Sequence, residues 1–296
     1  MTDHILSARD GAILRLTFNR PEKKNAITAA MYAALADGLV AADRDEGVRA
    51  VVFSSHGDVF TSGNDIADFM AGAATPADGS KPAVFRFLEA IATAEKPLIA
   101  AVQGPAVGVG VTMLLHCDLV YAAERATFHT PFVDLGVVPE AASSLLLPQI
   151  AGHQRAAEML IAGKKIGAER AREFGFVNEV VAADALEETA LAAARAIAEK
   201  APAAIKLTKR LMKGDRAPVL ARMKEEGAHF AAQLQSAEFR EAGSDLLPSV
   251  QAKERLITLG NNAIAIREHR RVKVTRSPEG AQATITRTMR PSPANP

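Results

Sequence analysis

The sequence predicts an α/β fold in which short buried strands alternate with helices, followed by a region made of helices alone. Strand-like runs recur between longer patterns with helical spacing, at 13–18, 50–54, 98–102, 118–122, 127–128 and 176–181. Beyond about residue 200 only helical patterns follow, at 202–212 and 218–235. This change of pattern indicates an α/β core over 1–200, a helical region over 201–243 and a separate tail over 244–296.

Composition favours a globular protein that acts on a small molecule. Of the 296 residues, 48% are hydrophobic and 23% are charged, which is close to average usage, and the net charge is +1. Neither a nucleic acid nor a membrane is therefore expected as a partner. Because the chain has no apolar run of ~18 residues and no signal-peptide core near Met1, a cytoplasmic location is expected. Cys117, the only cysteine, is expected to be a small buried filler.

Further helical patterns separate the predicted strands, at 28–42, 84–94, 111–117, 143–150, 154–162, 168–173 and 185–200. Residues 71–82 are rich in small and polar types and are expected to form a mobile surface segment. Residues 267–290 contain seven Lys or Arg and two acids. The tail is therefore expected to be a solvated, poorly ordered extension rather than a contact for nucleic acid.

The stretch 98–147 contains the features that point to chemistry. After the strand at 98–102, a turn marked by Gly104, Gly108 and Gly110 leads into an uncharged helix that is expected to lie in the core. The first amides of that helix lack intrahelical partners and carry the positive end of its dipole, so they are suited to an anionic oxygen.

Glu140 is the leading candidate for a catalytic acid or base. It is the only charged residue between 135 and 150, and Pro139 precedes it. Apolar surroundings favour the neutral form of a carboxyl group and make the ionised form a stronger base. The alternative is a structural glutamate at a helix N-terminus, which the Pro139-Glu140 pair also fits.

Short motifs follow one another along residues 5–239: NRP at 19–21, KNA at 24–26, FTSGND at 60–65, KP at 96–97, GPAVG at 104–108, CD at 117–118, FHTPF at 128–132, LG at 135–136 and PE at 139–140. In this order they resemble the crotonase (enoyl-CoA hydratase/isomerase) superfamily, and most closely its peroxisomal-type Δ3,Δ2-enoyl-CoA isomerases. The resemblance implies a crotonase-like spiral of β-β-α units. It also implies a C-terminal helical oligomerisation region that forms homotrimers or dimers of trimers.

By this resemblance, the backbone amides of Asn64 and Val109 would hold the thioester oxygen of an acyl-CoA substrate. Removing a proton beside a thioester places negative charge on that oxygen, and preorganised donors stabilise it. Gly63, Gly108 and Gly110 would let the substrate approach closely. Either loop alone would be interpreted as an ordinary turn, whereas both in order indicate an oxyanion hole.

The sequence departs from the hydratases of the superfamily at the two positions where those enzymes have glutamates. Thr112 and Phe132 occupy these positions, and neither side chain can serve as acid or base. Because hydration needs one group to activate water and another to deliver a proton, the chain is expected to be a poor hydratase. Isomerisation needs a single base, which the resemblance places at Glu140.

Motif positions imply further contacts to CoA or substrate, from Lys24, Ala26, Ser62, Gly63, Asp65, Ile66, Gly108, Phe132 and Leu135. Asp65 also fits a helix cap and Asp118 a structural carboxylate, while His116 and His129 are expected to be packed and hydrogen-bonded. No residues have metal-ligand spacing, and no cofactor is expected beyond the CoA thioester that serves as substrate.

The leading hypothesis is a Δ3,Δ2-enoyl-CoA isomerase of fatty acid β-oxidation that works by a single-base 1,3-proton transfer. Two alternatives stay open. One is another acyl-CoA reaction of the superfamily, including weak hydration that uses Asp134 or Glu140. The other is acyl-CoA binding without turnover, against which the carboxylate at Glu140 argues.

Overall fold

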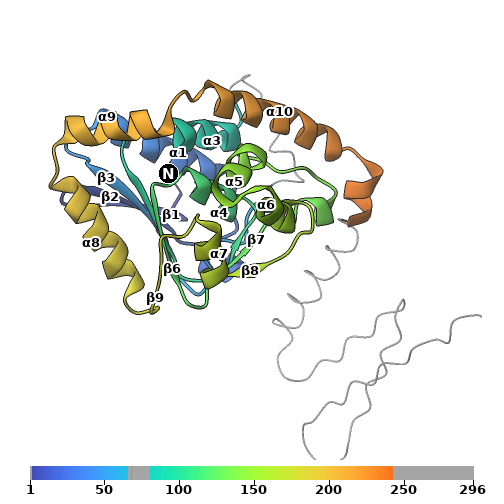
Figure 1. Ribbon diagram of the computed structural model, residues 1–296, viewed down its shortest axis with the longest axis horizontal. Coiled ribbons are helices and arrows are strands. Elements are labelled where there is room, and N and C mark those ends of the chain that lie inside the picture. The colour runs from blue at the N-terminus through green and yellow to red at the C-terminus, as the bar shows by residue number, and fades with distance from the viewer. Residues whose placement is uncertain (1, 66–67, 69–80, 243–296) are drawn as a thin grey trace, which may run out of the picture. The chain divides into compact units, whose positions relative to one another are not determined.

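The computed structural model describes residues 2–65, 68 and 81–242 (Figure 1). The chain as far as Ala242 forms one compact unit. The predicted mobile segment at 71–82 lies almost entirely outside the described residues, and the tail after residue 243 and Ile66 lie wholly outside them.

A six-stranded sheet crosses this unit, in the order β1-β2-β3-β4-β6-β9. β1 pairs antiparallel with β2, and the other four pairs are parallel. Its strands are β1 (Ile5–Asp10), β2 (Ile13–Phe18), β3 (Ala50–Ser55), β4 (Leu98–Val102), β6 (Leu119–Ala123) and β9 (Glu179–Val181). A smaller sheet contains β5 (Ala106–Val107), β7 (Thr127–His129) and β8 (Ile166–Gly167).

Helices connect and cover these strands, namely α1 (Ala29–Arg44), α3 (Ala83–Thr93), α4 (Val109–Thr112), α5 (Ser143–Ala151), α6 (His153–Leu160), α7 (Ala168–Phe174) and α8 (Leu186–Ala198). Short 3-10 turns are η1 (Pro21–Lys23), η2 (Met113–His116) and η3 (Val133–Leu135). The uncharged helix predicted at 111–117 thus begins at Val109 and tightens into η2. Its residues from Val109 to His116 are all buried, as predicted.

The parallel strands are apolar on both faces because helices cover the sheet on both sides. On one face, Leu16 of β2, Leu35 of α1 and Phe87 of α3 belong to the main core. On the other, α8 packs against β3, β4 and β6 (Figure 1), and Ile99 and Ala190 belong to a second cluster. The predicted α/β fold of the spiral type is confirmed.

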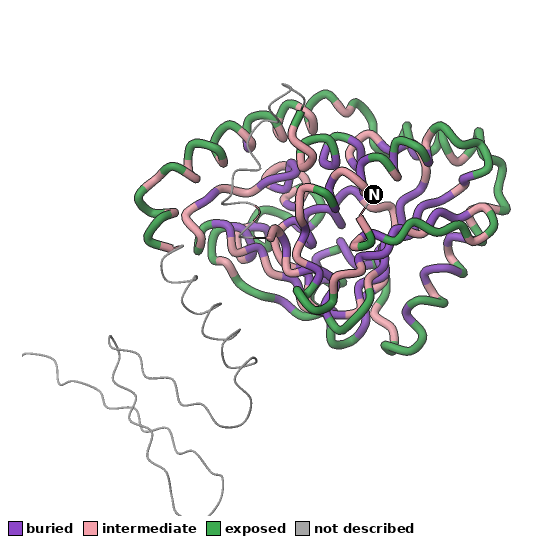
Figure 2. Tube along the Cα trace, turned by 180° about the vertical axis from the view of Figure 1, so that it is seen from behind, coloured by how far each residue is buried: buried purple, intermediate pink, exposed green. Residues whose placement is uncertain are grey.

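Two further helices, α9 (Pro202–Lys213) and α10 (Ala217–Gln233), belong to the same compact unit as the sheet. Most of α9 is exposed (Figure 2), including Leu207, Leu211 and Met212, whereas Lys209 is buried. Exposed apolar side chains on a helix are compatible with subunit contacts. Trimer formation and a domain boundary near residue 200 stay predictions.

Candidate active site

Two glycine-containing loops lie against each other at the candidate site. One follows β3 and contains Gly63 and Asn64, and the other connects β4 to α4. Val107 N donates to the carbonyl oxygen of Thr61 at 3.0 Å. Gly63 has φ +86°, and a Cβ built there would lie 3.0 Å from the carbonyl oxygen of Val107. Only glycine permits this approach without displacing the second loop.

The amides of Asn64 and Val109 are not used to hold the loops together. Asn64 lies in a parallel bridge with Ile27, in which Ile27 N donates to Gly63 O (2.8 Å) and Asp65 N donates to Ile27 O (3.0 Å). Val109 is the first residue of α4, so its amide has no intrahelical acceptor. Neither amide has an acceptor among residues 2–65, 68 and 81–242. The pair is therefore free to donate to a ligand oxygen.

Asn25 holds the first loop in place. Its buried side chain accepts a hydrogen bond from Arg20 N (2.8 Å) and donates to the carbonyl oxygens of His56 (2.9 Å) and Val59 (2.8 Å). Its own carbonyl oxygen accepts from the Thr61 hydroxyl at 2.7 Å. A buried amide with this many bonds fixes the loop and is itself costly to remove.

The residues predicted to contact CoA gather beside this loop. Lys24 is exposed, and its carbonyl oxygen accepts from Ser62 N at 3.0 Å. Arg20 forms an ion pair with Asp65 (2.6 Å) and donates to the carbonyl oxygen of Ala26 (3.0 Å). The structure therefore brings the neighbouring NRP and KNA motifs against the FTSGND motif, which lies well downstream in the sequence.

Glu140 is buried, with 9% of its surface exposed, and its Oε1 has no hydrogen-bond partner in the described structure. Burial and, secondarily, the negative charge of Glu226 raise the pKa of Glu140 to about 7. An isolated buried carboxylate is unfavourable for folding, so its presence favours a chemical role. The side chain of Glu140 therefore does not point to solvent.

The backbone after Glu140 is strained. Ala141 (φ 60°) and Ala142 (φ 56°) are both left-handed, a conformation that costs ~1–2 kcal/mol for a residue with a Cβ. The carbonyl oxygen of Glu140 accepts from both the amide (3.0 Å) and the hydroxyl (2.6 Å) of Ser143. Such strain persists only where surrounding contacts enforce it, and it is concentrated at functional sites.

His116 forms a hydrogen bond to this strained segment. It is buried, and its Nε2 lies 2.8 Å from the carbonyl oxygen of Ala141, to which it can only donate. Burial lowers the pKa of His116 to about 4, so the ring is neutral at physiological pH. The predictions that His116 and His129 are packed and hydrogen-bonded are both confirmed, since His129 Nε2 lies 3.0 Å from Gly163 O.

Tyr32 is a site residue that the sequence did not reveal. It lies on α1, is 4% exposed, and donates its hydroxyl to the side-chain oxygen of Asn64. Burial and the charge of Glu140 raise the pKa of Tyr32 well above 10. Tyr32 is thus hydrogen-bonded to Asn64 and electrostatically coupled to Glu140. In the sequence Tyr32 stands beside Met31 in an ordinary helical pattern. The only local signal that could have identified it is its hydroxyl group on an otherwise apolar helix face.

The other residues singled out in the sequence differ in how far they are buried. Phe132 is buried, and Leu135 is half-buried and packed against the main core. Thr112 is fully buried, and its hydroxyl has no hydrogen-bond partner in the described structure. The side chain of Asp134 is 59% exposed, and its carboxylate lies 4.0 Å from His129 Nε2. An exposed carboxylate of this kind is a weak candidate for a second acid.

Two carboxylates serve the structural roles predicted for them. Asp65 accepts a hydrogen bond from Asp68 N at 3.1 Å. Asp118 accepts from Leu98 N (2.8 Å) and pairs with Lys209 of α9 (2.7 Å). Cys117 is only partly buried by area, yet burial of its thiol raises its pKa to about 12, so it is not a nucleophile.

Within the described ranges, no three His, Cys, Asp or Glu side chains gather in a way that could hold a metal ion. In the same part of the chain, no helix is both long enough and apolar enough to cross a membrane.

The spiral fold and the pair of free amides define a protein of the crotonase class. The family model of enoyl-CoA hydratase/isomerase matches residues 8–253, and the chain belongs to this family of enzymes.

Individual relatives agree with this assignment. Enoyl-CoA delta isomerase 2 of Rattus norvegicus is 40% identical over 225 residues, which cover 75% of this chain but only 57% of the relative. 1,2-Epoxyphenylacetyl-CoA isomerase of Escherichia coli is 36% identical over 67% of this chain and 77% of its own length. The crystal structure of an enoyl-CoA hydratase/isomerase from Pseudoalteromonas atlantica has a TM-score of 0.81 and 44% identity, covering 83% of this chain and 98% of that one.

Proposed function

We propose that this protein is a Δ3,Δ2-enoyl-CoA isomerase in which Glu140 is the single base. The observation that carries the proposal is the state of Glu140: a buried carboxyl group whose Oε1 has no partner in the described structure, with a pKa of about 7 and coupled to Tyr32, which bonds to Asn64. The name of the rat relative supports an isomerisation of an enoyl-CoA.

The proposed reaction begins when Glu140 takes a proton from C2 of a 3-enoyl thioester. As the C2–H bond breaks, its electron pair moves into the thioester, and charge develops on the oxygen bound by the amides of Asn64 and Val109. The resulting dienolate accepts the same proton at C4, which leaves a double bond between C2 and C3. Atoms and electrons balance, so the step requires no cofactor.

Isomerisation is favoured over hydration because the described site holds one poised carboxyl group. Thr112 and Phe132 stand where a hydratase would need acids, and Asp134 is exposed. We therefore expect hydration of a 2-enoyl-CoA to be at least ~10²-fold slower than isomerisation, since one positioned proton-transfer group is missing.

CoA would meet the cluster formed by Lys24, Ala26, Ser62, Gly63 and Asp65, with the exposed ammonium of Lys24 facing its phosphates. The acyl chain would contact Phe132 and Leu135. A different rearrangement of a CoA thioester, as the name of the E. coli relative indicates for that protein, would use the same base and the same amides.

The experiment that tests the proposal follows the absorbance of the conjugated 2-enoyl thioester formed from a 3-enoyl-CoA. Hydration of a 2-enoyl-CoA is measured in parallel as the comparison. Formation of the conjugated product supports the proposal. Binding of both thioesters without turnover of either one would contradict it and favour a binding protein.

The activity should depend on pH through Glu140. A base must be ionised to accept a proton, and the pKa of Glu140 is about 7. We expect kcat/KM to fall about tenfold per pH unit below pH 7 and to level off above it. A pH–rate profile with 3-enoyl-CoA measures this directly. A profile that stays flat down to pH 5 would exclude a base with a raised pKa.

A further inference from the structure

The strained segment after Glu140 is bound by a carboxylate that comes from the C-terminal helix. Glu226 of α10 is 5% exposed and lies 84 residues along the chain from Ala142. Its Oε2 accepts from Ala142 N at 2.6 Å, and its Oε1 accepts from the amide (3.0 Å) and the hydroxyl (2.5 Å) of Ser144. Arg222, also on α10, donates to the same hydroxyl at 3.1 Å.

These bonds replace a helix cap that α5 lacks. The residue before α5 is Ala142, which has no side chain able to accept a bond and sits at φ 56°. The first amides of a helix need acceptors, and a carboxylate there also complements the helix dipole. Glu226 supplies both functions from outside the helix. The conformation of Ala142 therefore depends on α10.

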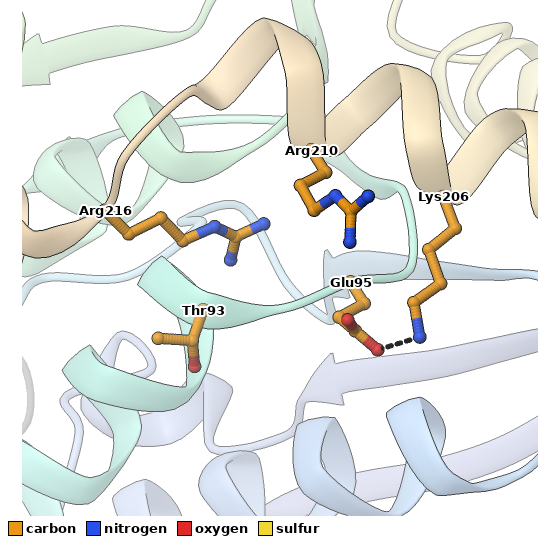
Figure 3. Close-up of a pocket in the computed structure, with 5 residues that line it drawn as sticks. All are labelled: Thr93, Glu95, Lys206, Arg210 and Arg216. Atoms are coloured by element: carbon orange, nitrogen blue, oxygen red, sulfur yellow. Dashed lines mark ion pairs between the residues drawn. The ribbon is translucent and has the colours of Figure 1, made fainter.

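The position of α10 is in turn set by contacts with the core. Figure 3 shows Arg216, just before α10, extending toward the end of α3, where it donates to the carbonyl oxygens of Ala92 (2.8 Å) and Ala94 (3.3 Å). Arg216 lines a cavity of about 220 Å³ together with Glu95 and Lys206, which form an ion pair. Polar contacts around this cavity therefore connect the end of α3 to α9 and to the start of α10.

The preceding helix, α9, contacts the strained segment indirectly, through His116. Lys213, the last residue of α9, donates to the carbonyl oxygen of His116 at 3.1 Å. His116 donates to the carbonyl oxygen of Ala141 at 2.8 Å. The two C-terminal helices therefore hold both left-handed alanines, Ala141 through His116 and Ala142 through Glu226.

We infer that Glu226 is a positioning residue: it holds the backbone at Ala142 in its strained conformation and so places the carboxylate of Glu140 for proton transfer. This inference rests on the proposed role of Glu140 as base. It makes α10 part of the catalytic site.

Glu226 also acts on Glu140 through charge. Burial raises the pKa of Glu226, while the hydrogen bonds from Ser144 and Ala142 and the positive charge of Arg222 oppose that rise and favour the ionised form. The negative charge of Glu226 helps to raise the pKa of Glu140, and Tyr32, the other titratable group coupled to Glu140, is neutral. Removing the charge of Glu226 should therefore lower the pKa of Glu140.

The test compares Glu226→Gln with Glu169→Gln in the full chain. Glutamine matches glutamate in size but cannot accept all three bonds or supply the charge. We expect kcat to fall about 10- to 100-fold, because small misplacements of a base have effects of this size, while KM changes little. The acidic limb of the pH–rate profile should move to lower pH. Glu169, which is exposed and forms an ion pair of the same i,i+3 type with Arg172 on the surface of α7, is the matched control and should behave like the wild type.

A second measurement separates this inference from the proposed function. The pKa of Glu140 is followed by ¹³C NMR of labelled glutamate carboxyl groups, with Glu140→Gln used to assign the signal. If the wild type shows no isomerase activity, the proposed function fails, but a lower pKa of Glu140 in Glu226→Gln would still support the coupling. An unchanged pKa of Glu140, or unchanged kcat in a Glu226→Gln variant that turns over substrate, would overturn the inference.

Discussion

Replacing Glu140 with glutamine is expected to reduce isomerase activity by ~10²–10⁴, the usual effect of losing a positioned proton-transfer group. Glutamine keeps the size of the side chain but cannot accept a proton at neutral pH. The amides of Asn64 and Val109 are unchanged in this variant, so CoA thioesters should still bind. The measurement is the rate at which 3-enoyl-CoA is converted to the conjugated thioester, together with thioester affinity.

The same substitution should stabilise the fold, which separates loss of chemistry from loss of structure. Because the pKa of Glu140 rises from 4.5 in the unfolded chain to about 7 in the native protein, the native state holds its proton more tightly. Stability contributed by this group is complete below pH 4.5 and is lost as pH rises through 7. At pH 8 the loss is about 3 kcal/mol. Urea unfolding should show Glu140→Gln to be more stable than the wild type at pH 8, with the difference shrinking toward pH 4.5.

An inactive variant that is also less stable at pH 8 would indicate that Glu140 is structural. In that case the helix-terminal role that the sequence also allowed for Glu140 would be the better explanation.

The main elements of the fold could be predicted because the apolar or polar character of their residues matches where those residues lie in the structure. β2 and β4 match the predicted runs at 13–18 and 98–102, since a buried strand needs apolar residues at those positions. β1 was missed because it lies at the sheet edge and exposes most of its residues, so it lacks an apolar pattern. β5 and β8 have two residues each, which is too short for any periodicity.

The residues around Glu140 were harder to predict because their roles depend on distant partners. An isolated acid in an apolar run identified Glu140 itself. Glu226, by contrast, follows Lys224 and Glu225 on a helix whose other residues are exposed or half-buried, and nothing local marks it as the buried one. Tyr32 likewise acquires its role only when α1 meets the loop that contains Asn64. Local sequence therefore identifies the base but not the side chains that orient it.

The second large effect is expected from Gly110→Ala, which should lower kcat/KM by ~10²–10³ by separating the two loops of the oxyanion site. A Cβ at position 110 would lie 2.5 Å from Cγ2 of Thr61. Thr61 is buried and cannot turn away freely, because its hydroxyl donates to the carbonyl oxygen of Asn25 (2.7 Å) and accepts from Gly63 N (3.1 Å). Relieving the clash must therefore move the backbone near Asn64 or that of α4.

Gly167→Ala is the matched control, because a Cβ at that position meets no atom within 4 Å and its backbone is not left-handed. Kinetics with 3-enoyl-CoA should show full activity for Gly167→Ala and a loss confined to Gly110→Ala. Since Glu140 lies on a separate segment, its acidic limb in the pH–rate profile should keep its position near pH 7 in Gly110→Ala. A Gly110→Ala variant with wild-type kcat/KM would show that the spacing of the two amides does not limit the reaction, and the oxyanion role of Asn64 and Val109 would have to be abandoned.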